Sequence, residues 1–199
     1  MSIFNLITQN YNLDSKIVAG LERLSQVFKI LLWDKAKEKG LSPIQIQLLI
    51  FIEHHSVEKT TVSYLSKEFN VTKPTISDAV KILEQKELIQ KISDVKDSRS
   101  YTIKLTESGK KIVAETEDFP DPITQILSVK NDAEKEIIWN AISDLIIKLN
   151  RADIISVQRT CYNCKYYATH ETEHFCNFLH APLHNKDIRI DCLEFENKS

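Results

Sequence analysis

Four cysteines lie close together near the end of the sequence, at a spacing that suits metal binding. The pattern is Cys161-x2-Cys164-x11-Cys176-x15-Cys192. A Cys-x2-Cys pair places two sulfurs on one tight turn, at about the separation that a tetrahedral metal site needs. Two further cysteines complete a set of four thiolates. We therefore predict a small metal-binding module over residues 161–199, with these four cysteines as ligands.

The ligand set leaves the metal open between two candidates. Zinc is the ordinary metal for a closed site of four thiolates, so zinc is the predicted cofactor. An iron–sulfur cluster uses the same four thiolates and is the alternative. The ending Asp191-Cys192-x-Glu194-Phe195 loosely resembles small cluster domains of the high-potential iron protein type. Free thiols or a redox pair remain a further possibility. Four nearby histidines could each replace a cysteine, although such residues more often lie at the surface: His170, His174, His180 and His184.

A second group of residues, in the middle of the chain, suits contact with duplex DNA. A helix is predicted over 72–86, with Thr72 as its cap and Lys73-Pro74 in its first turn. Ile76, Val80 and Leu83 form its inner face, and its other face carries short polar side chains. The DNA major groove, about 12 Å wide, admits one such helix.

The flanking segments predict the elements that would present this helix. Apolar residues at helical spacing indicate helices over 13–39, 43–54, 61–69, 106–118 and 131–150. Strand-like runs at 88–92 and 101–105 enclose a polar tip and predict a β-hairpin. The fold class is therefore mainly α, a winged helix-turn-helix with a two-stranded β wing. Lys96 and Arg99 at the hairpin tip can reach the DNA backbone or the minor groove.

Two stretches resemble the multiple antibiotic resistance regulator (MarR) family. They are VSYLSKEFNVTKPTISDAVKILEQKELIQK, in the helix-turn-helix, and DSRSYTIKLTESGKKI, which carries the wing signature Asp-x-Arg followed by Leu-Thr-x-x-Gly. The resemblance covers about residues 13–150. It implies a homodimer whose first and last long helices intertwine, and binding to a palindromic operator, usually as a repressor. It also implies a small-molecule or oxidant effector.

The resemblance assigns the DNA-binding residues by position. On the recognition helix it implies Thr72, Lys73, Pro74, Thr75, Ser77, Asp78 and Lys81; on the wing it implies Arg99, braced by Asp97. Three positions depart from the family pattern. Glu87 replaces a usual glycine, Ser98 replaces a common second wing arginine, and Asp78 stands where a basic residue is frequent. Asp78 could accept a hydrogen bond from cytosine or repel phosphate.

The length of the terminal helices also favours a dimer. Ile17, Leu21, Leu24, Phe28 and Leu31 form one apolar stripe on the first long helix. A helix of about 25 residues spans nearly 40 Å, which is more than a small domain can cover. A partner chain should cover the rest, and a two-fold dimer also places two recognition helices one DNA turn apart.

Charge and composition narrow the class of protein. The net charge is −2 overall, but residues 59–111 hold eleven Lys and Arg against seven Asp and Glu. A basic middle in an acidic frame suits a protein that contacts phosphates with one part only. No signal peptide or membrane span is recognisable, so we expect a cytoplasmic location. Four thiolates leave no open metal position for a substrate, so an enzyme is not expected.

These observations predict a DNA-binding transcription regulator with three parts. Residues 1–150 would form the winged helix-turn-helix with its dimerisation helices, 151–160 a linker, and 161–199 the metal module, structural or sensory. The alternative is a metal- or redox-dependent interaction protein with a degenerate helix-turn-helix, which the acidic balance, Asp78 and Ser98 favour.

Overall fold

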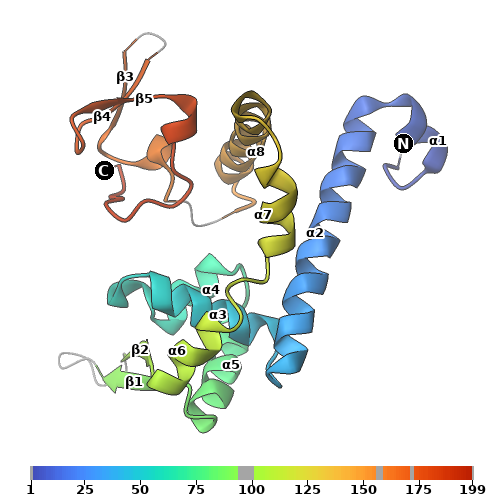
Figure 1. The fold of residues 1–199 in the computed structure, drawn as a ribbon. Coiled ribbons are helices and arrows are strands. Elements are labelled where there is room, and N and C mark those ends of the chain that lie inside the picture. Colours follow the sequence, from blue (N-terminus) through green and yellow to red (C-terminus); the bar gives the residue numbers. More distant parts are fainter. Residues whose placement is uncertain (1, 94–100, 156–158, 171–172, 199) are drawn as a thin grey trace. The chain divides into compact units, whose positions relative to one another are not determined.

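The computed structural model describes residues 2–93, 101–155, 159–170 and 173–198, and it is mainly helical (Figure 1). The chain divides into two compact units. The first comprises residues 1–57 and 79–123, and the second comprises residues 58–78 and 124–199. No helix within the described ranges is long and apolar enough to cross a bilayer.

Three helices open the first unit. They are α1 (Leu6–Tyr11), α2 (Leu13–Glu38) and α3 (Pro43–His54). Gly40 ends α2 with φ +60°, a left-handed conformation that glycine adopts without steric cost. The N–H of Ser42 then donates to Gln45 Oε1 (2.8 Å), half of a capping box that starts α3. The two predicted helices are confirmed here, whereas α1 was not predicted.

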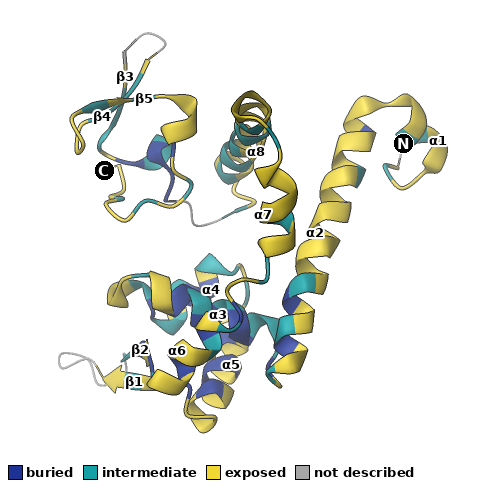
Figure 2. Cartoon of the chain, viewed as in Figure 1, coloured by how far each residue is buried: buried dark blue, intermediate teal, exposed yellow. Residues whose placement is uncertain are grey.

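The core of the first unit is built around α3. Ile46, Leu48 and Leu49 are completely buried, which agrees with the prediction that this helix is covered on most sides (Figure 2). Strands β1 (Ile89–Ser93) and β2 (Tyr101–Leu105) pair antiparallel. Their buried face packs toward α3 and α6 (Glu107–Ala114). The two strands and their antiparallel pairing confirm the predicted wing hairpin.

Gly109 explains the Leu-Thr-x-x-Gly part of the wing signature. A Cβ at Gly109 would lie 2.0 Å from the carbonyl oxygen of Leu88, so only glycine fits this approach. Thr106 fixes the same junction, because its hydroxyl donates to the carbonyl of Glu87 (2.7 Å) and accepts from the N–H of Gly109 (3.1 Å). The signature residues therefore hold the segment that directly follows α5 (Lys73–Gln85) against the start of α6.

The segment after α6 differs from the prediction. The helix ends at Ala114 rather than near 118, and turns lead to α7 (Asp121–Ser128). Pro122 is the second residue of α7. Proline is tolerated there because first-turn N–H groups have no helical partner.

The second unit contains α4 (Val62–Glu68), the beginning of α5, α8 (Asp132–Arg151) and the cysteine-rich module. The module has a three-stranded antiparallel sheet of β3 (Tyr167–His170), β4 (Glu173–Cys176) and β5 (Ala181–Leu183). Trp139 Nε1 of α8 donates to the carbonyl of Asn185 (2.8 Å), which fastens the module to that helix. This sheet was not predicted.

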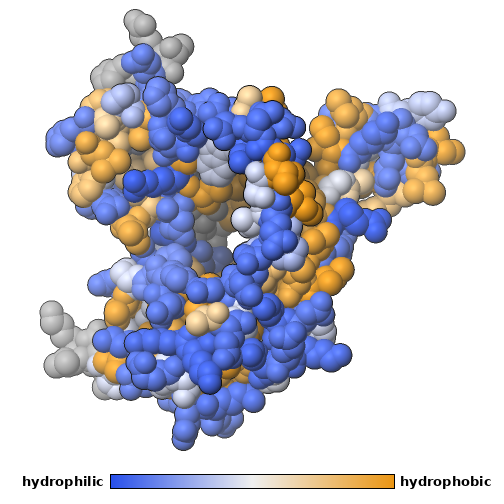
Figure 3. All heavy atoms as spheres, in the orientation of Figure 1, coloured by the Kyte–Doolittle hydropathy of each residue, from blue (hydrophilic) through white to orange (hydrophobic). Residues whose placement is uncertain are grey.

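Helix α2 leaves most of its apolar side chains exposed in the single chain. Only Ser15, Leu32 and Ala36 are buried along its 26 residues. Of the predicted stripe, four side chains are exposed and Leu31 is half-buried: Ile17, Leu21, Leu24 and Phe28. Figure 3 shows this hydrophobic surface along α2. Apolar surface of this extent on one element marks an interaction site.

Replacing Gly109 with alanine is expected to destabilise the protein by about 2 kcal/mol, because the added methyl must displace the Leu88 backbone. Chemical denaturation measures this directly. Ser108→Ala, at the exposed neighbouring position of α6, is the matched control and should stay within about 0.5 kcal/mol of the parent. An equally small effect of Gly109→Ala would contradict the close approach.

Candidate nucleic-acid interface and cysteine pocket

Helix α5 (Lys73–Gln85) has one buried and one exposed face. Ile76, Val80 and Leu83 are completely buried. The polar residues predicted to contact DNA are all exposed: Thr72, Lys73, Pro74, Thr75, Ser77, Asp78 and Lys81. Thr72 caps the helix as predicted, since its hydroxyl oxygen accepts from the Thr75 N–H (3.3 Å). The arrangement presents short polar side chains to solvent at the N-terminal end of the helix.

The end of α5 explains one departure from the family pattern. Glu87 has φ +57°, and the N–H of Leu88 donates to the carbonyl of Leu83 (3.0 Å). These are features of a Schellman motif, whose left-handed position is most often glycine. Glu87 therefore occupies a conformation that is strained for any residue with a Cβ.

The wing is described only in its two strands. Lys96, Asp97, Ser98 and Arg99 fall outside the described residues, so their roles stay predictions. On the described part, Lys91 Nζ pairs with Glu84 Oε2 of α5 (2.6 Å), which ties β1 to that helix. The positions of the other predicted DNA-binding residues agree with DNA contact, and their contacts with DNA also remain predictions.

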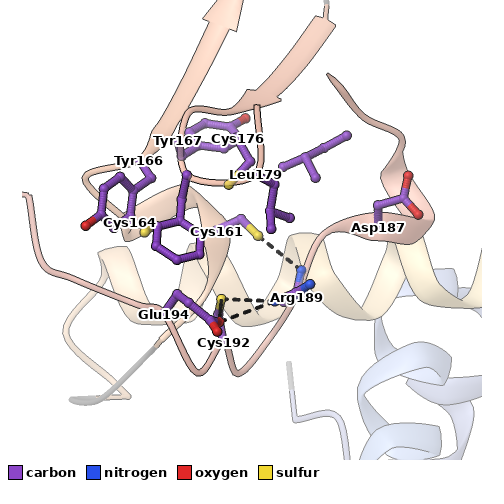
Figure 4. Close-up of a pocket in the computed structure, with 12 residues that line it drawn as sticks. Cys161, Cys164, Tyr166, Tyr167, Cys176, Leu179, Asp187, Arg189, Cys192 and Glu194 are labelled. Atoms are coloured by element: carbon purple, nitrogen blue, oxygen red, sulfur yellow. Dashed lines mark hydrogen bonds and ion pairs between the residues drawn. The ribbon is translucent and has the colours of Figure 1, made fainter. Parts of the chain in front are cut away.

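All four cysteines line one pocket in the second unit. Figure 4 shows their sulfur atoms placed around a common space, with Arg189 and Glu194 near Cys192. No disulfide joins them. The remaining lining of the pocket is largely aromatic and aliphatic: Tyr166, Tyr167, Phe178, Leu179, Leu183, Asp187, Arg189 and Glu194.

Two N–H groups of Arg189 point at the sulfurs. Its backbone N–H donates to Cys161 Sγ (3.3 Å), and its guanidinium donates to Cys192 Sγ (3.4 Å). Burial raises the pKa of the Cys161 thiol, and the hydrogen bond from Arg189 works in the opposite direction. A metal that binds here must displace that proton, since the thiolate is the ligand.

The described histidine side chains of the module lie outside the pocket. His174, His180 and His184 do not line the pocket with the cysteines, and the side chain of His170 lies outside the described part of the chain. His174 instead lies 2.6 Å from the hydroxyl of Tyr167 through its Nδ1. Burial, together with the neighbouring Tyr162 and Cys161, raises the pKa of Tyr167 to about 12. Tyr167 thus lines the pocket, while its hydroxyl is held by His174.

The sulfurs do not form a ready-made site for one ion. Within the described residues, no three His, Cys, Asp or Glu side chains converge closely enough to hold a single metal ion. The four cysteines nevertheless line one pocket, and they come from the turn at Cys161–Asn163 with the residue after it, from β4 and from the C-terminal segment. The binding of zinc or of an iron–sulfur cluster by these cysteines stays a prediction.

Arg159 is a buried residue that the sequence analysis did not single out. Its side chain is 6% exposed. The guanidinium donates two hydrogen bonds to Asp191 (2.5 and 2.6 Å), two to Glu68 (2.6 and 3.0 Å) and one to the hydroxyl of Tyr64 (2.9 Å). Burial opposes its charge, but the carboxylates of Asp191 and Glu68 outweigh burial and raise the pKa of Arg159. Nothing in its sequence neighbourhood signals this role, because both carboxylates are distant along the chain.

Comparison with protein families gives a match to the part of the chain that contains the winged helix. Residues 39–100 match the MarR family. The winged helix-turn-helix of this chain is thus similar to that of the MarR family. No curated protein sequence matches the chain.

Solved structures agree with this. The MepR–DNA complex of S. aureus is 26% identical, with a TM-score of 0.59, over 66% of this chain and 97% of the MepR chain. MepR in its DNA-binding conformation is 25% identical, with a TM-score of 0.58, over 67% and 98%. A MarR transcriptional regulator from Methanosarcina mazei Go1, 24% identical over 69% and 97%, has the same fold with a TM-score of 0.57. The chain therefore has the fold of MarR transcription regulators, and about a third of it lies beyond these matches.

Replacing Glu87 with glycine should stabilise the protein by roughly 0.5–1 kcal/mol. Relief of the left-handed strain exceeds the extra entropy of the unfolded chain. Gln85→Gly, two residues earlier in ordinary helical conformation, should instead destabilise by up to about 1 kcal/mol. Thermal melts of both variants measure these changes in stability. A lower Tm for Glu87→Gly than for the parent would contradict the left-handed strain at Glu87.

Proposed function

We propose that this protein is a transcription regulator that binds a palindromic DNA operator as a homodimer and acts as a repressor. The observation that carries the proposal is the exposed polar face of α5 within a MarR-type winged helix. The proposal includes a metal held by Cys161, Cys164, Cys176 and Cys192, and an effector of small-molecule or oxidant type that alters DNA affinity.

The chemistry of the α5 face supports contact with both bases and phosphates. Thr75 and Ser77 present hydroxyls that can donate to or accept from base edges. Lys73 and Lys81 supply positive charge, and the N-terminus of this 13-residue helix favours a nearby phosphate. Phosphate contacts fix the position of the protein on the duplex, and base contacts provide specificity.

The apolar surface of α2 supports the homodimer. Leu24 is 55% exposed in the single chain, and Phe28 is 45% exposed. On α8 the predicted apolar positions Ile142, Leu145 and Leu149 are exposed to a similar degree. A second copy would remove both surfaces from water, and its two-fold symmetry would match a palindromic operator.

Asp78 favours a second candidate function. It is exposed in the middle of the polar face, where a carboxylate repels phosphate unless it accepts from a cytosine amine. A metal- or redox-dependent interaction protein with a degenerate helix-turn-helix would tolerate this charge. Footprinting on the DNA upstream of its own gene separates the two, because only the regulator protects a defined palindromic sequence.

Lys81→Ala should weaken binding to that DNA several-fold and reduce the slope of log affinity against log salt concentration by about 1, as expected for one lost phosphate contact. Gel-shift titrations across a salt series measure both quantities. Lys148→Ala, which removes an exposed lysine of α8 paired with Asp144, is the matched control and should leave the slope unchanged. Equal slopes for all three proteins would contradict the role of Lys81.

Leu24→Glu should raise the dissociation constant of the dimer by about tenfold or more. The reason is that a carboxylate would be buried without a partner in the apolar stripe. Light scattering coupled to size exclusion measures the mass, and DNA affinity should fall with it. Gln26→Lys places a charge on the opposite side of the same helix turn and should remain dimeric. A dimeric Leu24→Glu variant would show that α2 is not the interface.

A further inference from the structure

We propose that the cysteine pocket holds an iron–sulfur cluster rather than a single zinc ion, and that Arg159 transmits the presence of this cluster to helix α4. The second part rests on the proposed DNA-binding function. The first part concerns only the pocket, and it is testable without DNA.

The arrangement of the sulfurs argues against one ion. Four thiolates bound at about 2.3 Å from one zinc must lie about 3.8 Å from one another. Among the described residues, no three potential ligands converge in this way, although all four cysteines line the same pocket. In a cluster the thiolates bind different iron atoms, so a wider ring of sulfurs is what the ligand set requires.

The lining suits a cluster as well. Phe178, Leu179 and Leu183 contribute apolar surface, which lowers the local dielectric and limits access of water. The backbone and guanidinium N–H groups of Arg189 donate to two of the four sulfurs. Hydrogen bonds to ligand sulfurs, together with a nearby positive charge, stabilise an anionic cluster with four thiolates.

Arg159 lies between two of the ligand-bearing segments. Cys161 follows it by two residues, and the backbone N–H of Cys192 donates to the carbonyl of Arg159 (3.2 Å). Its partner Asp191 directly precedes Cys192 and forms a β-bridge with Arg159. A cluster that fixes Cys161 and Cys192 therefore fixes both the backbone and the carboxylate that orient the guanidinium.

The guanidinium of Arg159 also donates hydrogen bonds to two residues of α4. Glu68 is the last residue of that helix and Tyr64 lies one turn earlier. A tight turn joins α4 to α5, with Asn70 at φ +50° and the N–H of Val71 donating to the carbonyl of Ser66 (3.0 Å). Because this turn is short and hydrogen-bonded, a shift of Glu68 displaces the first, DNA-facing turn of α5.

The first experiment identifies the metal. The full chain, purified without oxygen, is assayed for iron, zinc and acid-labile sulfide, with a visible absorption spectrum. We expect about two or about four irons with equal sulfide per chain and broad visible absorption. Cys176→Ser should lose both, whereas His184→Gln, outside the pocket lining, should keep them. One zinc per chain, or neither metal, would overturn the proposal.

The second experiment measures transmission. Binding to the DNA upstream of its own gene is compared between the cluster-loaded protein and protein stripped of iron by a chelator. We expect the loaded form to bind at least about fivefold more tightly. Glu68→Gln keeps the side-chain size but removes the charge that faces Arg159, and should bring this ratio close to one. Asp144→Asn, which breaks an exposed ion pair on α8, should keep the parent ratio.

The outcomes separate the two proposals. If neither form of the parent protein binds this DNA, the proposed regulatory function fails, whereas the metal assay still decides the cluster. If both forms bind equally, DNA binding stands and transmission is refuted. If Glu68→Gln does not fold, Tyr64→Phe removes one hydrogen bond to Arg159 and should reduce the ratio partially. An unchanged ratio in the folded variant would exclude Arg159 as the link.

Discussion

A buried guanidinium needs carboxylates, and this requirement organises the second unit. Arg159 is almost fully removed from water, and a charge in that position is tolerated only with paired and hydrogen-bonded partners. Glu68 comes from α4 and Asp191 from the segment next to Cys192, so satisfying one charge connects three distant stretches of sequence. Such a pair contributes specificity of position more than net stability. The Arg159 ion pairs therefore fix the position of the cysteine-bearing segments relative to helix α4.

In the first unit the unsatisfied groups are apolar rather than charged, because much of the apolar surface of α2 is exposed to water. The C-terminal end of α2 packs on α3 through Leu32 and Ala36, whereas the rest of its stripe faces solvent. Exposed isoleucine, leucine and phenylalanine on a helix of this length cost solubility unless a second chain covers them. A dimer satisfies the stripe and at the same time supplies the second α5 that a palindrome needs. Hydrophobic burial and DNA geometry thus point to the same assembly.

The sequence predicted the parts of the fold in which local signals and tertiary packing agree. Helices α2, α3 and α5 have apolar periodicity together with clear caps, and all three were located to within about two residues. The helix predicted over 106–118 ends at Ala114 and α7 was not predicted, because a proline such as Pro122 can either end a helix or occupy its first turn. The strands of the module are three or four residues long, too short for a periodic pattern. The cysteines were recognised by spacing, but Arg159 depends on contacts that spacing does not encode.

The module also lacks an ordinary core, and this bears on the role of its cysteines. Between Cys161 and Lys198, the buried apolar residues within the described ranges are Cys161, Cys164 and Ile188. Three short strands and these few residues cannot offset the entropy of ordering nearly forty. The space that a core would fill is the pocket that the four sulfurs surround. In the proposed holoprotein, bonds from these sulfurs to a common inorganic group would supply the missing stabilisation, so folding of the module and occupancy of the pocket would be one equilibrium. On this proposal, loss of the inorganic group would change the structure of the segment that Arg159 joins to Glu68 of α4.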